Sequence, residues 1–230
     1  MSEQTINSDI TTKQKTRILT PTEYEKLRAA MISAEDQKTL DIALAKGDKY
    51  TANRIQRYQI ICDVLLQTGM RPIEFKRLQP SWYRGARRCL ELPPGACLKE
   101  KCEYKERTIK LSLPGCDAVE RYLNAEVKVG KEGKIVYLRD VKPEKVAMRD
   151  ALRRYAIKAG IQDIGVTPKM FRKTLVSWLV ACYPERSLYI QSSMGHNADT
   201  IVKNYMGIVF LKEERIKMRE KYLVEWGIDL

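Results

Sequence analysis

The stretch TANRIQRYQIICDVLLQTGMRPIEFKRL (residues 51–78) predicts two helices joined at a glycine. Apolar residues recur at helical spacing over 51–68, which favours one long helix with a buried face. Gly69 is expected to end this helix, and Pro72 suits the first turn of a short second one. Arg71 lies at the junction, so the stretch predicts a helical fold that places a basic side chain at a helix break. The residues expected on the buried face are Ile55, Tyr58, Ile61, Leu65 and Leu66.

The rest of the chain is also mostly helical in pattern. Thr20, Pro21 and Glu23 predict a capped helix start at the segment 20–31. Alternating apolar residues indicate short strands near 90–92, 96–98 and 109–111, with 99–107 as an exposed hairpin, and an extended piece at 133–138. We therefore expect a mainly α fold with a small antiparallel β-sheet (α+β). Further helices are expected at 114–123, 144–158, 168–182, about 185–193, from about 200, and 211–226.

One domain is expected to follow a short tail. Residues 1–17 are polar without an apolar period, which predicts a disordered tail. The remaining 18–230 is enough chain to bury a single core. Its last helix, 211–226, offers Ile216, Tyr222 and Leu223 as candidate apolar contacts.

Charge and cysteine usage narrow the class of protein. The chain has 42 basic and 29 acidic residues, a net charge of +13, which favours a polyanionic partner such as nucleic acid. A solvated basic surface is the alternative. Six cysteines without a CxxC pair, and a single histidine, argue against a zinc site and favour reduced thiols in a cytoplasmic protein. No apolar run approaches the roughly 18 residues of a membrane span, so no membrane partner is expected.

Two basic segments suggest chemistry on a phosphodiester. In TPKMFRKT (167–174), Lys169, Arg172 and Lys173 share one helix face, where like charges repel unless an anion binds; a solvated basic stripe is the alternative. In MGHNADTIVKNYMG (194–207), His196 precedes Tyr205 by nine positions. A tyrosine hydroxyl, with a pKa of about 10, is a poor nucleophile unless cations stabilise the phenolate. Arginines and a histidine around Tyr205 would suit attack on a phosphodiester without a metal.

TGMRPIE (68–74), KMFR (169–172), MGH (194–196) and Tyr205 together resemble the tyrosine recombinase (phage integrase) family in order and spacing. The resemblance runs from about residue 18 to the end and implies that family's catalytic-domain fold. The family's second motif has histidine where this chain has Lys169. A lysine there is similar to the pattern of some archaeal viral and plasmid integrases, and it removes a group that titrates near neutral pH.

The resemblance implies a role for each matching residue. Arg71 and Arg172 would clamp the scissile phosphate, His196 would contact it or steady Tyr205, and Tyr205 would be the nucleophile. The family's general acid is a hairpin lysine, for which Lys101 is preferred because it is nearer the turn, with Lys99 as the alternative. Lys169 would supply a further cation, and Glu74 would support an active-site cation or be a plain surface residue. The residues expected to contact DNA are Lys173, Lys203, Lys105 and Arg107.

The function implied is a site-specific DNA recombinase or integrase that works through a covalent 3′-phosphotyrosyl intermediate. It would need no cofactor, and would bind double-stranded DNA as a homo-tetramer. The segment 208–230 would pack on a neighbouring protomer, or within its own chain. Most family members carry an N-terminal domain that clamps DNA, and a full one is not expected in this chain. A type IB topoisomerase-like enzyme and a non-catalytic DNA-binding protein are the alternatives.

Overall fold

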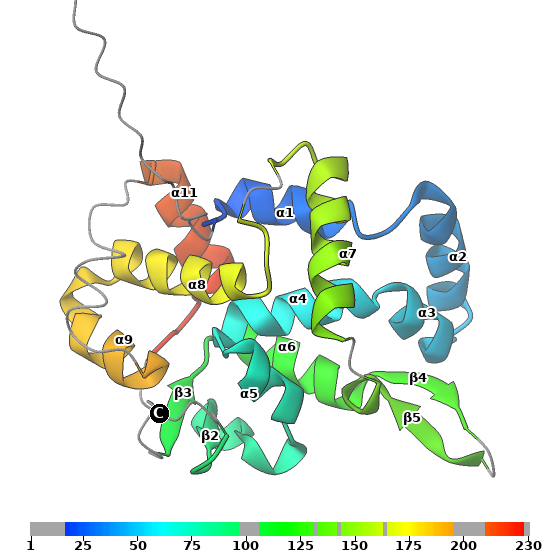
Figure 1. Ribbon diagram of the computed structural model, residues 1–230, viewed down its shortest axis with the longest axis horizontal. Helices are drawn as coiled ribbons and strands as arrows, with labels where there is room; N and C mark the ends of the chain where they lie inside the picture. The colour runs from blue at the N-terminus through cyan, green and yellow to red at the C-terminus, as the bar shows by residue number, and fades with distance from the viewer. Residues whose placement is uncertain are drawn as a thin grey trace, which may run out of the picture.

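The computed structural model describes residues 17–96, 106–130, 133–141, 144–162, 165–195 and 210–227. Figure 1 shows helices α4 and α6 crossing the middle of the molecule, with α8 and α9 at one end and α2 and α3 at the other. The helices are α1 (Pro21–Ala29), α2 (Ala34–Ala45), α3 (Lys49–Ile55), α4 (Arg57–Thr68), α5 (Pro72–Arg77), α6 (Leu113–Asn124), α7 (Lys145–Lys158), α8 (Lys169–Cys182), α9 (Ser187–Met194) and α11 (Lys212–Lys217). The strands are β1 (Tyr83–Arg84), β2 (Cys89–Leu92), β3 (Arg107–Lys110), β4 (Glu126–Val129) and β5 (Ile135–Tyr137). The mainly helical class with small antiparallel sheets is confirmed.

The core lies where α4 packs against α6 and α8. Ile61 and Leu65 of α4 are buried there, as the helical period predicted. Two hydrogen bonds fix the chain before α1 to α8: the Trp178 indole donates to the Leu19 carbonyl at 2.8 Å, and the Leu19 amide donates to Thr174 Oγ1 at 3.0 Å. The predicted capping box that begins α1 at Thr20 is also confirmed.

The segment 51–68 is two helices, so the prediction of one long helix was wrong. Helix α3 ends at Ile55 and α4 begins at Arg57. The physical reason is that α3 and α4 pack against different hydrophobic clusters. Ile55 is half-buried against a small separate cluster of Leu40, Ala43 and Ala52, whereas α4 is buried in the main core. Helix α2, which the sequence did not predict, has apolar side chains on both its buried and its exposed sides, so its period is weak.

Three strands form the first sheet in the order β1-β2-β3, all antiparallel. Leu90 of β2 lies opposite Ile109 of β3, and both side chains are fully buried. The expected strand at 96–98 is wrong as far as the structure describes it: Ala96 lies in a turn, and 97–98 fall outside the described residues. A second sheet, β4-β5, forms a hairpin at the α2–α3 end (Figure 1).

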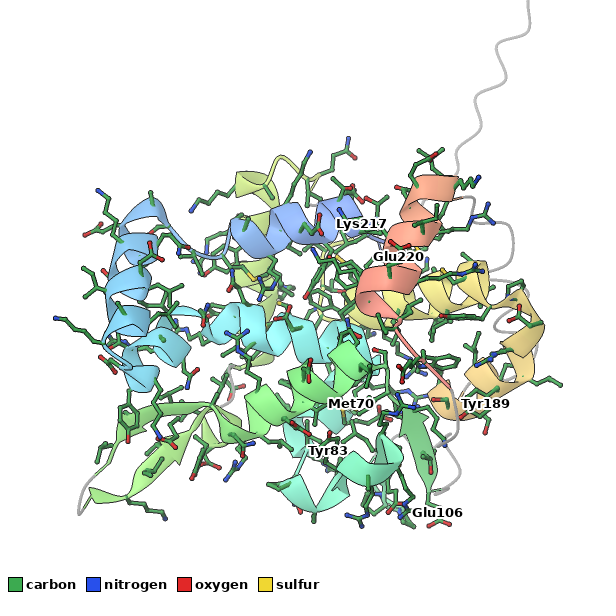
Figure 2. The ribbon with its side chains drawn as sticks, turned by 180° about the vertical axis from the view of Figure 1, so that it is seen from behind. Met70, Tyr83, Glu106, Tyr189, Lys217 and Glu220 are labelled. Carbon is green, nitrogen blue, oxygen red and sulfur yellow. The ribbon has the colours of Figure 1, made fainter. Side chains whose placement is uncertain are left out.

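The C-terminal segment packs within its own chain over 210–227. Helix α11 continues into a π-helical turn, η6 (Met218–Tyr222), rather than one helix to 226. Tyr222, Leu223 and Trp226 are buried as part of the main core, but Ile216 is 44% exposed, which contradicts its predicted contact. Figure 2 shows Lys217 of this segment beside α1, where its ammonium binds the Glu25 carboxylate. None of the helices within the described ranges combines the length and apolar character that a membrane span requires.

Candidate active site

The site begins at the break between α4 and α5. Gly69 ends α4 in the left-handed conformation, at φ +57°, as a helix-terminating glycine does. Arg71 then precedes α5 in an extended conformation, with Pro72 in the first turn. The backbone turn therefore projects Arg71 from a fixed junction, which is the placement that the sequence predicted for it.

Glu74 is the buried carboxylate that organises this junction. Its side chain is 1% exposed. It accepts the Arg71 backbone N–H at 2.6 Å on one oxygen and Arg71 Nη1 at 2.9 Å on the other. It also accepts Arg107 Nη2 at 2.5 Å. A buried carboxylate is costly unless it is paired and hydrogen-bonded, and here two guanidinium groups satisfy it. Of the two interpretations open for Glu74, the geometry matches support of a cation and not an exposed surface residue.

Arg172 reaches the same place from α8. It is 8% exposed, although the sequence placed it on a helix face with Lys169 and Lys173. Its Nη1 donates to the Gly69 carbonyl at 2.8 Å, and its Nη2 donates to the Met194 carbonyl. Lys169 is exposed and Lys173 is half-buried, so the three cations differ in burial although they share one helix. The contact with Gly69 joins the second predicted motif to the first.

The end of α9 is the point at which the arginines meet. The helix stops at Met194, and Gly195 follows in the left-handed conformation at φ +60°. Arg107 Nη1 donates to the Met194 carbonyl at 2.6 Å, and Arg71 Nη2 donates to the Gly195 carbonyl at 3.2 Å. Carbonyls at a helix C-terminus carry partial negative charge, so cations bind there favourably. Three guanidinium groups thus surround the turn that leads into His196.

The charge of this cluster suits an anion. Arg71, Arg107 and Arg172 carry three positive charges against the single negative charge of Glu74, which leaves +2 on these four side chains. Arg71 is the most exposed of the three arginines, with 24% of its side chain accessible. One guanidinium group can donate two N–H bonds to two oxygens of the same phosphate, so the cluster has the chemistry of a phosphate site.

Several predicted residues lie outside the described part of the chain. They are His196, Lys203 and Tyr205, and the hairpin lysines Lys99, Lys101 and Lys105. Their roles stay predictions. Within the described residues, no group of three His, Cys, Asp or Glu side chains is close enough to hold a metal ion.

Arg107 is the residue whose place the sequence did not foresee. It was expected to contact DNA from an exposed hairpin, and that contact is untested. In the structure its side chain is only 11% exposed and lies on Glu74 and the α9 carbonyls. A signal was available, because Arg107 is two residues before Ile109 and therefore on the same, buried face of β3.

Comparison with known proteins identifies the family. The model of the phage integrase family matches residues 10–210, which is most of the chain. The chain belongs to the phage integrase family. The predicted resemblance is thereby confirmed. No curated relative matched the sequence.

Solved structures of two recombinases and a transposon integrase share the fold. A XerA recombinase structure has a TM-score of 0.54 at 19% identity, over 89% of this chain and 64% of that one. The Tn1549 transposon integrase in complex with transposon right end DNA has a TM-score of 0.54 at 19% identity, over 92% and 67%. The XerH site-specific recombinase bound to its difH substrate has a TM-score of 0.50 at 17% identity, over 84% and 51%. This chain thus spans from about half to two thirds of the length of these proteins.

Proposed function

We propose that this chain is a tyrosine recombinase that cleaves and rejoins double-stranded DNA without a cofactor. The observation that carries the proposal is the meeting of Arg71, Arg107 and Arg172 at the carbonyls of Met194 and Gly195, the two residues before His196. A +2 cluster of this kind can bind a phosphodiester and stabilise the further negative charge that develops during attack. The family match and the fold shared with recombinases support DNA as the substrate.

Tyr205 is the proposed nucleophile. Its hydroxyl oxygen forms a bond to the scissile phosphorus and its proton passes to solvent, while the bond from phosphorus to the 5′ oxygen breaks. The products are a 3′-phosphotyrosyl link and a 5′ hydroxyl, which receives a proton from a hairpin lysine, Lys101 or Lys99. Attack by a 5′ hydroxyl of a second strand reverses the step. Because the covalent link preserves the phosphodiester bond energy, no nucleotide is consumed.

Two arginines in this mechanism have defined partners in the structure. Arg71 is held by Glu74, and Arg172 by the carbonyls of Gly69 and Met194, so the phosphate would meet guanidinium groups that are already oriented. Such preorganisation lowers the barrier because little reorganisation accompanies the reaction. His196 would contact the phosphate or steady Tyr205, and Lys169 would add a cation from the start of α8. Exchange between two duplexes would take place in a homo-tetramer on DNA.

The test is covalent trapping. The full chain is mixed with a pool of nicked duplexes of randomised sequence, from which the cleaved fragment diffuses away. A denaturing gel should show a slower protein band, and mass spectrometry should place the DNA on Tyr205. Tyr205→Phe should bind the same DNA with unchanged affinity and form no adduct. Tyr50→Phe is the matched control, because Tyr50 is a half-buried tyrosine on α3, at the opposite end of the molecule from α9 (Figure 1).

Each other result selects an alternative. An adduct that persists in Tyr205→Phe moves the nucleophile to another residue. Relaxation of supercoiled DNA without exchange between duplexes would favour a type IB topoisomerase-like enzyme. Salt-sensitive DNA binding with no adduct on any duplex would favour a non-catalytic DNA-binding protein.

A further inference from the structure

We propose that Arg107 is the counter-ion of Glu74, and that it thereby leaves the Arg71 guanidinium able to bind a DNA phosphate. This inference rests on the proposed function and gives Arg107 a positioning role in it. Arg107 acts through Glu74 on Arg71, and not by touching the phosphate itself. Arg107 comes from β3, whereas Glu74 lies on α5 and Arg71 directly precedes α5, so no local sequence pattern relates Arg107 to the other two.

Glu74 has one negative charge and two guanidinium partners. Its Oε2 accepts Arg107 Nη2 at 2.5 Å and the Arg71 backbone N–H at 2.6 Å, and its Oε1 accepts Arg71 Nη1 at 2.9 Å. The Glu74 side chain is 1% exposed, so bulk water contributes little to the stability of its charge. A buried carboxylate of this kind needs a cation beside it. Arg71 and Arg107 therefore share the neutralisation of a single charge.

The two arginines differ in their surroundings. The Arg107 side chain is 11% exposed, and its Nη1 donates to the carbonyls of Met194 at 2.6 Å and Ser193 at 3.3 Å. Carbonyls carry only partial negative charge, so the Glu74 carboxylate matches the charge of Arg107 more fully than they do. The Arg71 side chain is 24% exposed. Arg107 is thus the inner counter-ion, and Arg71 is the guanidinium that a phosphate can reach.

The consequence is that phosphate binding by Arg71 depends on Arg107. With all three arginines present, Arg71, Arg107, Arg172 and Glu74 carry a total charge of +2. Loss of the Arg107 charge alone lowers the total to +1 and leaves Arg71 as the guanidinium bound to Glu74. An ion pair in a poorly hydrated place is strong, and this one would compete with phosphate for the same N–H donors. Loss of the Arg107 and Glu74 charges together restores +2 and removes the competition.

The test is a double-mutant cycle on DNA affinity. The wild-type full chain, Arg107→Met, Glu74→Gln and the double variant are each titrated against one fluorescently labelled duplex at fixed salt. Methionine keeps an unbranched stem beside Gly195, where an added Cβ would lie 3.2 Å from Arg107 Cδ. We expect Arg107→Met to weaken binding by the wild-type chain about 10-fold, as loss of one charge-assisted phosphate contact would. In the Glu74→Gln chain it should weaken binding by about 3-fold or less, because no buried carboxylate remains to hold Arg71.

Two controls separate this role from a general loss of charge. The matched pair is Arg84 and Glu91: Arg84 Nε donates to the Glu91 carboxylate at 2.8 Å in the same sheet, but these side chains are 42% and 33% exposed. Because solvent screens such a pair, Arg84→Met should change affinity equally, within about 2-fold, in the wild-type and Glu91→Gln chains. Arg71→Met should weaken binding at least as much as Arg107→Met, because Arg71 is the proposed phosphate contact. Thermal unfolding of each variant checks that it is folded.

Other results would overturn the inference. Equal losses from Arg107→Met in the wild-type and Glu74→Gln chains would mean that Arg107 touches DNA or only supports the fold. An Arg71→Met chain with wild-type affinity would remove the phosphate contact on which Arg107 is proposed to act. If Arg107→Met does not fold, the double variant, which lacks the buried carboxylate, is compared with Glu74→Gln, and a loss of more than about 3-fold there would refute the inference.

Failure of the proposed function gives a different result. Salt-sensitive DNA binding with the expected cycle, but with no covalent adduct on any nicked duplex, would remove the proposed cleavage and leave the role of Arg107 standing. Wild-type cleavage with equal losses in the cycle would remove the inference alone. Absence of DNA binding by the wild-type chain would remove both.

Discussion

Gly69→Ala should lower the free energy of unfolding by more than the cost of placing alanine in a left-handed backbone conformation. Gly69 adopts φ +57°, and a Cβ there would lie 3.0 Å from both Leu175 Cδ2 and Met194 Sδ. Those two side chains are almost fully buried, at 1% and 0% exposure, so neither can turn away into solvent. The Gly69 carbonyl also accepts Arg172 Nη1, which means that a shift of this residue moves the second proposed phosphate clamp.

The expected magnitude has two parts. An alanine in the left-handed conformation costs about 1 kcal/mol. Forcing a methyl group into a packed core costs a further 1–3 kcal/mol or so. Gly160→Ala isolates the first part, because Gly160 has φ +69° and nothing within 4 Å of an added Cβ. The difference between the two variants should therefore be about 1–3 kcal/mol, a sizeable fraction of the stability of a domain.

Urea unfolding of the two variants and the wild type measures this difference. The midpoints should fall in the order wild type, Gly160→Ala, Gly69→Ala, with unchanged m-values. DNA cleavage by Gly69→Ala should also be slower than by Gly160→Ala, because Arg172 is displaced. Equal destabilisation by the two substitutions would refute the close packing of Gly69 against α8 and α9.

Two further predictions concern charge. Burial would raise the pKa of Glu25, but hydrogen bonds from Lys217, Lys221 and Tyr222 outweigh it and lower the pKa from 4.5 to about 2. Glu25→Gln should therefore lower the free energy of unfolding by about 1 kcal/mol at pH 7, after allowance for solvent screening. Urea unfolding across pH should show this difference disappear as the pH falls from 4.5 towards 2, because the carboxylate is then protonated in both the folded and the unfolded state. A difference that persists at pH 2 would contradict the ion-pair origin. Lys101→Ala should lose single-turnover cleavage of an ordinary duplex and regain it on a duplex whose leaving 5′ oxygen is replaced by sulfur, because a sulfur leaving group needs little proton donation. The same rescue in Lys99→Ala instead would reassign the general acid.

Local patterns predicted the helix boundaries well where one core governs a segment. Gly69 ends α4, Pro72 begins α5, and Thr20 caps α1, because each of these signals acts through neighbours within a few residues. The prediction failed at Gln56, where the chain passes from the small α2–α3 cluster to the main core. It also failed for the last helix, whose α11 continues into the π-helical turn η6.

The candidate site also divides into residues that the sequence predicted and contacts that depend on tertiary packing. Arg71, Arg172 and Glu74 could be chosen as candidate site residues from the sequence, because guanidinium groups bind phosphates and carboxylates bind cations. The burial of Arg107 was missed, although its two-residue spacing from Ile109 was a signal for it, because a lysine- and arginine-rich hairpin is typical of solvent exposure. Only the pairing of β3 with β2 and its docking on α9 turn that side chain inward.

By itself, the sequence determined the mainly helical class, the placement of Arg71 at a helix break, and the family to which the motifs point. These depend on short-range periodicity, capping and residue chemistry. Only the tertiary structure decided that Arg71, Arg107 and Arg172 converge on the carbonyls of 193–195, and that Glu74 is the buried carboxylate between two of them. Arg71 and Gly195 are 124 positions apart, and contacts at such separations depend on how the whole core packs.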